Sequence, residues 1–557
     1  MSALEVMETM NTSYNAMIDE FKEVQNIKEP LLQGLDKLEK WDAIFNDSTN
    51  NIEEKYTERL NDIKSSLDNN MSKLNASVLY LNTKNILPNT GVDITNELQM
   101  ILNSVEENAT LIFEKGEYIL ENEPTITKPI NILGNGVVLK NNTTKATLKI
   151  KDTNNVTISG ITFDGLWDGN ASILPRWNND GLYITSSTNI HIDNCIFKNY
   201  TDSGLRVSNS ENENETNRIT KNITVTNCYF DNIVQISTTF GGVENYIFNG
   251  NILCNIKSQL KFASNINPCK NVIITNNIFS NFNNLVQSGG AVIKLENVVN
   301  VNISNNVFEN MFSTIDSNVM GAIRCSNTFN NVAIKNNQFL DISDVAILLD
   351  SGKSNLIEIN DNTFKNCKRF IESKSNIIEL IDVSNNTFDT SSTSAFYLRN
   401  VDSVDKLVFK GNKCFNLSST ENNFYINSTN TFIFKNNSLI NSGKGIMLYG
   451  VKQSQIINND LLNTHLLLYS SATSNSQIKD DYKNRTVYMI NNNINYDSPT
   501  TSTGFMDINQ VNLYAYNNSI VNVNNCFKVT NNEGFKIDGN NNYQVGASYN
   551  TTFPVNQ

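Results

Sequence analysis

The sequence has few of the residues that build metal sites, and it has no long apolar run. Its 557 residues include only two histidines, His191 and His465, and no CxxC pair. The ligand spacing of a typical zinc site is therefore missing, and we expect neither a metal ion nor another cofactor. A transmembrane helix needs roughly 18 or more consecutive apolar residues. No such run occurs, so we expect no membrane insertion.

Positive charge is also scarce. The chain carries 43 Lys and Arg against 56 Asp and Glu, a net charge of -13. This balance disfavours general binding to nucleic acid or to an anionic membrane surface, although it leaves room for a local cationic strip. The residues Met1-Ser-Ala-Leu-Glu-Val-Met-Glu lack the basic and apolar regions of a secretory signal peptide.

The cysteines are interpreted as buried structural residues. Five of them lie beside one recurring phrase, as in Asn194-Cys-Ile-Phe197, and we expect them on equivalent inner positions as small hydrophobes. They are Cys195, Cys228, Cys367, Cys414 and Cys526. A reduced cytoplasmic compartment of assembly fits this pattern better than a disulfide scaffold.

The recurring phrase is clearest at Val301-Asn-Ile-Ser-Asn-Asn-Val-Phe308. Each copy alternates apolar and polar residues, turns at Asn and closes on a large apolar residue, which predicts a short strand and a sharp corner. Copies recur about every 22 to 34 residues, a period typical of a solenoid. The closing residues are Phe163, Phe197, Phe230, Phe279, Phe308, Phe339, Phe364, Phe388, Leu439, Leu461, Ile494, Ile520 and Tyr543, with weaker copies near Leu253 and Phe415.

The repeat predicts stacked coils of about three short strands, spaced about 4.8 Å apart. Asn side chains at matching corners are expected to hydrogen-bond to the Asn above and below, which is a structural role rather than a glycan-binding one.

Residues 1–86 follow a different pattern. Apolar residues recur every seventh position, which predicts a helical seam that must be buried against another helix. One column runs through Met10, Met17, Val24, Leu31, Leu38 and Phe45, and a later one through Leu60, Leu67, Leu74 and Leu81. Helices folding back within one chain would explain the pattern, but we favour a parallel, self-associating stalk.

Residues 87–150 carry a resemblance to a known family. A Gly-Val-Asp-x-Thr helix start, an apolar strand and Gly-x-Tyr resemble the opening segment of pectate-lyase-type right-handed parallel β-helices, particularly those of bacteriophage tailspikes and appendages. The matching residues are Gly91, Val92, Asp93, Thr95, Gln99, Gly116 and Tyr118. We therefore expect a mainly β protein, with an N-terminal α-helical stalk at 1–86, a cap at 87–150, a parallel β-helix at 151–543 and a short tail at 544–557.

The resemblance implies a virion protein of the phage tail or neck, assembled in the host cytoplasm as a homotrimer. Its N-terminal helices would attach to structural proteins of the neck or tail. Its β-helix would bind and depolymerise a host cell-wall polysaccharide or teichoic acid. The alternatives are a spike that binds its receptor without cleaving it, and a cellular surface polysaccharide lyase or adhesin.

The first candidate site lies on a second strand that recurs between the phrases, as in Ile293-Lys-Leu-Glu296. Its outward residues include the cations Lys294, Arg324 and Arg399 and the carboxylates Glu296, Asp350 and Glu372. Two carboxyl groups are what glycoside hydrolysis requires. We place Asp350 and Glu372 in one column, where mutual repulsion would keep one protonated. The cations would bind an anionic sugar or phosphate. The alternative is an exposed ladder of salt bridges.

A second candidate site is the loop around residues 164–181, which holds Trp167, Arg176, Trp177 and Asp180. The indole faces could stack on sugar rings, with Arg176 as partner for a phosphate or carboxylate. Simple capping of a coil edge is the alternative.

The catalytic signatures of related enzymes are missing. Pectate lyases hold calcium with clustered acidic residues, and no such cluster occurs, so hydrolysis is favoured over calcium-dependent lysis. Polygalacturonase-like members carry Asn-Thr-Asp, paired Asp, Gly-His-Gly and Arg-Ile-Lys. Only the fragment Asn179-Asp-Gly181 is present. The resemblance therefore implies fold and biological setting, not catalytic residues.

Overall fold

The computed structural model describes residues 78–544 together with Arg59 and Asn61. The internal gaps are 142, 171–177, 211–217, 240–241, 265–266, 285–290, 314–320, 375, 419–421, 465–485, 498–506, 510–511, 522–527, 531–534 and 538–541. The chain divides into two units, 1–69 and 70–557. The predicted helical seam, from Met10 to Leu74, lies outside the described residues.

The second unit opens with a strand rather than a helix. Strand β1 (Val78–Tyr80) pairs in parallel with β2 (Ala109–Ile112), and the short 3-10 helix η1 (Leu81–Lys84) follows it. Leu81 is fully buried in the core of the β-helix. The prediction of helix up to residue 86 is therefore wrong at its C-terminal end, because Leu81 packs with the first coil.

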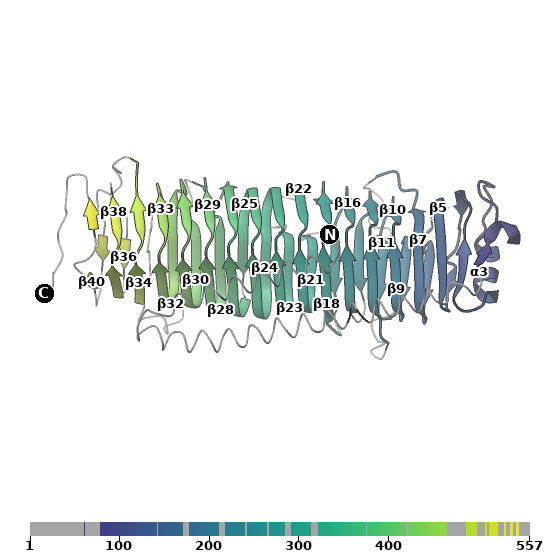
Figure 1. Ribbon diagram of the computed structural model, residues 1–557, viewed down its shortest axis with the longest axis horizontal. Coiled ribbons are helices and arrows are strands. Elements are labelled where there is room, and N and C mark those ends of the chain that lie inside the picture. The colour runs from purple at the N-terminus through teal and green to yellow at the C-terminus, as the bar shows by residue number, and fades with distance from the viewer. Residues whose placement is uncertain are drawn as a thin grey trace. The chain divides into compact units, whose positions relative to one another are not determined.

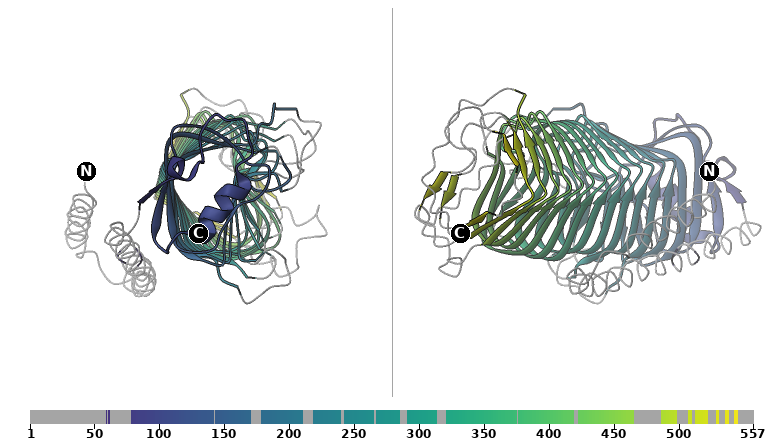
Figure 2. Two further views of the ribbon diagram at one scale, coloured as in Figure 1. Left: turned by 90° about the vertical axis from the view of Figure 1, so that its right-hand side faces the viewer. Right: turned by 60° about the vertical axis from the view of Figure 1, so that its left-hand side comes forward.

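Helix α3 (Thr95–Ser104) covers one end of the coil stack, as the end-on view in Figure 2 shows. Its apolar face, Leu98, Ile101 and Leu102, is buried in the core. Asp93 accepts hydrogen bonds from the backbone N–H groups of Thr95 and Glu121, both at 3.0 Å. These bonds join the segment before the helix to the helix start and to the first coil.

The remaining strands stack in parallel along one axis (Figure 1). Their bounds are β3 (Gly116–Ile119), β4 (Thr125–Ile126), β5 (Ile130–Lys140), β6 (Leu148–Lys151), β7 (Asn154–Asp164), β8 (Leu182–Thr185), β9 (Thr188–Asp193), β10 (Ile196–Lys198), β11 (Ser203–Ser208), β12 (Lys221–Thr226), β13 (Tyr229–Asp231), β14 (Gln235–Thr239), β15 (Glu244–Asn249), β16 (Ile252–Cys254), β17 (Gln259–Ala263), β18 (Cys269–Thr275), β19 (Ile278–Ser280), β20 (Asn283–Asn284), β21 (Ala291–Ser304), β22 (Val307–Ser313), β23 (Gly321–Lys335), β24 (Gln338–Asn360), β25 (Thr363–Lys374), β26 (Asn376–Ser384), β27 (Thr387–Ser391), β28 (Phe396–Lys410), β29 (Lys413–Phe415), β30 (Asn422–Lys435), β31 (Ser438–Ile440), β32 (Lys444–Ile457), β33 (Asp460–Leu462), β34 (Thr486–Ile490), β35 (Asn493–Asn495), β36 (Asp507–Asn509), β37 (Asn512–Tyr516), β38 (Ser519–Val521), β39 (Lys528–Thr530), β40 (Phe535–Ile537) and β41 (Asn542–Gln544). Each pairing is with the coil before or after, which defines a parallel β-helix.

The recurring phrase forms the corner and the core of each coil. In the coil of β21 and β22, Asn305 has a positive φ of 57° and turns the chain, and Phe308 then points into the core. Phe308 stacks on Phe279 and Phe339, each with a centroid distance of 4.8 Å. Asn tolerates this left-handed backbone at a lower cost than most residues, which explains why it recurs at this corner.

The second Asn of each phrase forms a buried hydrogen-bonded ladder, which confirms the predicted structural role. Asn306 donates from its backbone N–H and from Nδ2 to Oδ1 of Asn337, at 2.9 and 3.0 Å. Its Nδ2 also donates to the carbonyl of Ile274 at 2.9 Å. The ladder comprises Asn251, Asn277, Asn306, Asn337, Asn362, Asn386, Asn412, Asn437, Asn459, Asn492 and Asn518.

Of the two weaker copies of the phrase, one is confirmed and the other shifts by one residue. Leu253 does occupy the closing position, paired with Phe230 and Phe279. Phe415 does not, because Cys414 takes that position between Phe388 and Leu439.

Four of the five cysteines predicted to be buried are buried, namely Cys195, Cys228, Cys367 and Cys414, but they are not all equivalent. Cys228 occupies the ladder position, where its N–H donates to Asn251 Oδ1 at 2.8 Å. Cys414 instead fills the closing position, and Cys367 pairs with Ile342 and Ser391 beyond it. Cys526 lies outside the described residues. Cysteines that lie close to the phrase in the sequence therefore occupy different positions inside the coils.

Candidate functional site

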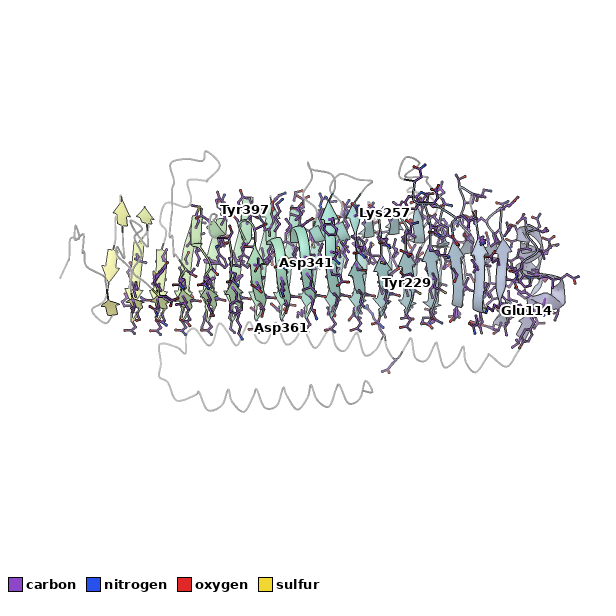
Figure 3. All side chains as sticks on the ribbon, turned by 90° about the horizontal axis from the view of Figure 1, so that it is seen from above. Glu114, Tyr229, Lys257, Asp341, Asp361 and Tyr397 are labelled. Carbon is purple, nitrogen blue, oxygen red and sulfur yellow. The ribbon has the colours of Figure 1, made fainter. Side chains whose placement is uncertain are left out.

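One column of aligned side chains, some partly exposed and some buried, follows the second strand from coil to coil. We call it the charged column. Parallel pairing aligns its members in register, about 4.8 Å apart per coil. In chain order they are Lys149, Tyr183, Arg206, Ser237, Lys261, Lys294, Arg324, Leu348, Glu372, Tyr397, Tyr425 and Met447. Tyr397, labelled in Figure 3, marks the column on the edge of the β-helix in that view.

Glu296 is engaged by a neighbouring cation. Its Oε1 lies 2.9 Å from Lys294 Nζ and accepts a hydrogen bond of 3.2 Å from Ser326 Oγ. Partial burial raises the pKa of Glu296, but the hydrogen bond and charge of Lys294, with smaller contributions from Lys261 and Ser326, lower the pKa overall. Glu296 is therefore ionised near neutral pH and is poorly suited to donate a proton as a general acid.

Asp350 is engaged in the same way by the adjacent coil, since it forms an ion pair with Arg324. Both side chains are about one-fifth exposed. Arg324 pairs in register with Leu348, two residues before Asp350, so the ion pair joins adjacent coils diagonally. The two predicted carboxylates, Glu296 and Asp350, thus belong to separate ion pairs.

Glu372 lies in a different column from the one predicted. It pairs in register with Leu348 and Tyr397, so it belongs with Lys294 rather than with Asp350. The expected pair of adjacent carboxylates, Asp350 and Glu372, does not form. Phe370 and Ile371 are both buried, which breaks the alternation by which the strand was aligned.

Glu372 is held between two cations. Its side chain is 3% exposed, forms an ion pair with Arg369 and lies 3.0 Å from Lys374 Nζ. The Arg369 guanidinium also lies over the Tyr397 ring, 4.5 Å from the centroid. The charged ladder foreseen as the alternative to catalysis is thus present in this part of the face.

The predicted site residues of the loop at 164–181 are either buried or outside the described residues. Trp167 is only 5% exposed, and its indole N–H donates to the Asn170 carbonyl at 3.1 Å. Its ring anchors the loop and presents little surface to a sugar, contrary to the prediction. Arg176 and Trp177 lie outside the described residues. So does the Arg399 side chain, although its backbone pairs with Lys374 and Asn427.

Asp180 belongs to a buried charge cluster. It is 1% exposed, accepts a hydrogen bond of 3.0 Å from the Ser203 N–H and lies 3.2 Å from Arg206 Nε. Arg206 also forms an ion pair with Asp202, which is fully buried and accepts a hydrogen bond of 2.9 Å from Gln235 Nε2. Burial raises the pKa of Asp180 to about 7, against the lowering effect of Arg206.

The sequence interpretation did not identify Asp202, Arg206 and Lys261 as site residues. Asp180 and Asp202 each precede the second strand in successive coils, with Gly181 directly after Asp180 and Gly204 two residues after Asp202, so this similar position could have revealed the pair. Lys261 lies on β17, a copy of the second strand that was not aligned. Burial lowers the pKa of Lys261, and the charge of Lys294 lowers it further, while Glu296 opposes both.

Metal-binding and membrane-spanning features were sought in the described part of the chain. Those residues include no group of three or more His, Cys, Asp or Glu side chains able to hold a metal ion. They also contain no helix with the length and apolarity that crossing a bilayer requires.

No protein-family model and no curated protein matches the sequence. Solved structures do match, at the level of the fold. ORF18 of Geobacillus virus E2 has 13% identity and a TM-score of 0.35, with 67% of this chain and 63% of that chain covered. A Thermotoga maritima exopolygalacturonase has 11% identity and a TM-score of 0.39, with 71% and 95% covered. Tailspike protein 3 of bacteriophage CBA120 has 10% identity and a TM-score of 0.28, with 86% and 63% covered.

The structural neighbours of this chain thus include a phage tailspike and a polygalacturonase. The chain spans less than two thirds of the length of the Geobacillus virus protein it matches. The similarity concerns the parallel β-helix, and the site must be interpreted from its own residues.

Proposed function

We propose that the protein is a tail or neck appendage of a bacteriophage whose β-helix binds a polymer of the host cell surface. The observation that carries the proposal is the charged column. It aligns cationic and aromatic side chains, with paired carboxylates beside them, at steps of about 4.8 Å on a parallel sheet. A linear polysaccharide or teichoic acid lying along the coils could contact several of these steps at once.

The ion pairs favour binding over acid–base chemistry within the charged column. Lys294 and Arg324 supply charge to the polymer, and Glu296 and Asp350 hold these cations in place. A catalytic role for Glu296, Asp350 and Glu372 stays a prediction, and it would require one of these paired carboxylates to be protonated.

A second candidate function, depolymerisation, is favoured by one observation at Asp180. A carboxyl group whose pKa is raised to about 7 can act as a general acid near neutral pH. Asp202 would supply the second carboxylate of a hydrolase, with no need for calcium. Both carboxyl groups are buried and paired with Arg206, so cleavage here requires these ion pairs to open.

The proposal also includes self-association of the protein through its N-terminal helices. The apolar heptads from Met10 to Leu74 support a parallel helical stalk, for which a homotrimer is the proposed state. The stalk would attach to neck or tail proteins and place the protein in the virion. Equilibrium sedimentation tests this directly: three chains per particle support the stalk, and a monomer rejects it.

The function is tested by incubating the purified full chain with host cell-wall polymer. Co-sedimentation with cell walls measures binding, and size-exclusion chromatography of the polymer measures cleavage. Binding with shortening that Asp180→Asn abolishes supports a depolymerase acting at Asp180. Binding without shortening supports a receptor-binding spike. If no surface polymer is bound, the proposal fails, and a cellular lyase or adhesin with another target becomes the better interpretation.

A further inference from the structure

A second column of aligned side chains, on another strand of the coil, carries no charge over much of its length. It follows the short strand around the closing residue of each phrase, as in β13, where Tyr229 precedes the buried Phe230. The first residue of this strand pairs in register from coil to coil. We call the following members the uncharged column: Val138, Thr162, Ile196, Tyr229, Ile252, Ile278, Val307, Gln338, Thr363 and Thr387. Glu117 precedes this run in register, and Lys413 follows it.

The middle of the uncharged column is an exposed apolar row. Its members are between 37% and 42% exposed, and they are Ile196, Tyr229, Ile252 and Ile278. Single exposed apolar residues are ordinary, but an uninterrupted row at steps of about 4.8 Å is a candidate contact surface. Figure 3 shows Tyr229 away from the edge that Tyr397 marks, in keeping with the different strands that carry the two columns.

The size of the apolar row indicates what kind of partner it fits. These partly exposed side chains offer a few hundred Å² at most, whereas a stable interface needs about 800 Å² from each partner. A protein that arrives from solution therefore gains too little area here. Copies of this chain that are already joined by the proposed N-terminal stalk are held at a high effective concentration, so a small contact suffices for them.

The absence of charge in the column indicates how such copies would be arranged. The chain has a net charge of -13, so copies packed side by side repel each other unless the facing surfaces are neutral. In a parallel cyclic assembly, a column that runs along the symmetry axis meets its own counterparts at the same height. Any charged residue in it would face an identical charge. The uncharged column, which is described at every position, avoids this repulsion from Val138 to Thr387.

We propose that the uncharged column is the surface by which the β-helices of separate copies of this chain contact one another, around an axis parallel to the coil stack. Each member of the apolar row then packs against the same residue of the neighbouring copies. This inference rests on the proposed self-association through the N-terminal helices, and it names the surface that the β-helix contributes.

Cross-linking of the full chain with a short bismaleimide tests the inference. Ile278→Cys places a thiol in the uncharged column, and the matched control Asn302→Cys places one at an exposed position on the strand of the phrase. Each variant also carries Cys254→Ser, because Cys254 is only partly buried. Ile278→Cys should join chains in pairs on a denaturing gel, with a cross-linked fraction at least about fivefold above that of Asn302→Cys.

An introduced charge gives a second readout. Ile252→Asp would set like charges against one another around the axis, and it should lower the cross-linked fraction of Ile278→Cys at least about threefold. Asn302→Asp makes the same change in net charge outside the column and should leave that fraction unchanged. Thermal melting of each variant separates loss of contact from loss of folding.

Equilibrium sedimentation of the same samples separates this inference from the proposed function. A monomer rejects the proposed self-association, and the inference with it. If the chains assemble but Ile278→Cys cross-links no more than Asn302→Cys, the inference is overturned while self-association stands, and the apolar row is open to a different protein. The inference is also overturned if Ile252→Asp leaves the cross-linked fraction unchanged.

Discussion

Replacing Asn337 by alanine should remove one complete rung of the asparagine ladder. Asn337 is 1% exposed, and its side chain takes part in four hydrogen bonds. Its Nδ2 donates to Ile303 O at 2.9 Å and to Asn362 Oδ1 at 3.0 Å. Its Oδ1 accepts from the N–H and the Nδ2 of Asn306, at 2.9 and 3.0 Å. At about 1 kcal/mol per bond, the loss in unfolding free energy should be about 4 kcal/mol.

Urea denaturation of Asn337→Ala against wild type measures this loss, and hydrogen exchange at the Asn306 amide locates it. Asn302→Ala is the control, because Asn302 is exposed on the adjacent strand and should change stability by less than about 0.5 kcal/mol. Asn337→Asp should be at least as harmful as alanine, since a carboxylate offers no donor to Ile303 O. If Asn337→Ala were as stable as Asn302→Ala, the ladder would not hold the coils together.

Three further outcomes follow from other parts of the structure. Phe339 stacks between Phe308 and Phe364. Phe339→Ala should therefore lower the free energy of unfolding, measured by urea denaturation, by about 3 to 5 kcal/mol. A loss below about 1 kcal/mol would contradict the stacked core. The pKa of Asp180 is raised from 3.8 to about 7, so the folded state binds the proton more tightly than the unfolded chain does. The free energy of unfolding should therefore fall as pH rises from about 4 to 7. Asp180→Asn should remove that part of the pH dependence in melting curves, and an unchanged profile would count against it. Glu296→Gln removes the carboxylate that interacts with Lys261 and Lys294. Affinity for a polyanion, measured by calorimetry, should therefore rise at least about twofold. A loss of about tenfold would show that Glu296 itself contacts the ligand.

The fold could be predicted in detail because its determinants are local and repeated. Each phrase carries its own strand, its own left-handed Asn and its own closing residue. The ladder at Asn306 and the stack at Phe308 therefore repeat in successive coils. Errors arose where one coil departs from the pattern. Cys414 replaces the expected closing Phe415, and the strand β1 begins where a heptad pattern continues into Leu81.

The candidate site was only partly predictable, because its geometry depends on register between coils. Lys294, Glu296, Arg324 and Asp350 were placed on one face, and the structure confirms that arrangement. The column of Glu372 could not be assigned, since two adjacent buried residues, Phe370 and Ile371, fit more than one alignment.

The sequence suggested a ladder of salt bridges as an alternative, but it did not show which residues would pair. Arg324 reaches Asp350 on the adjacent coil, and Arg206 brings together Asp180 and Asp202 from two coils. Such contacts arise from stacking residues that are far apart in the chain, which periodicity alone does not describe.

The structure of the protein in complex with a defined oligomer of its host's surface polymer tests the central claim most directly. We expect the oligomer to lie along the charged column, parallel to the coil stack, in contact with Lys294 and Arg324. An oligomer bound on another face, or across the coils with no contact to either residue, would contradict the account.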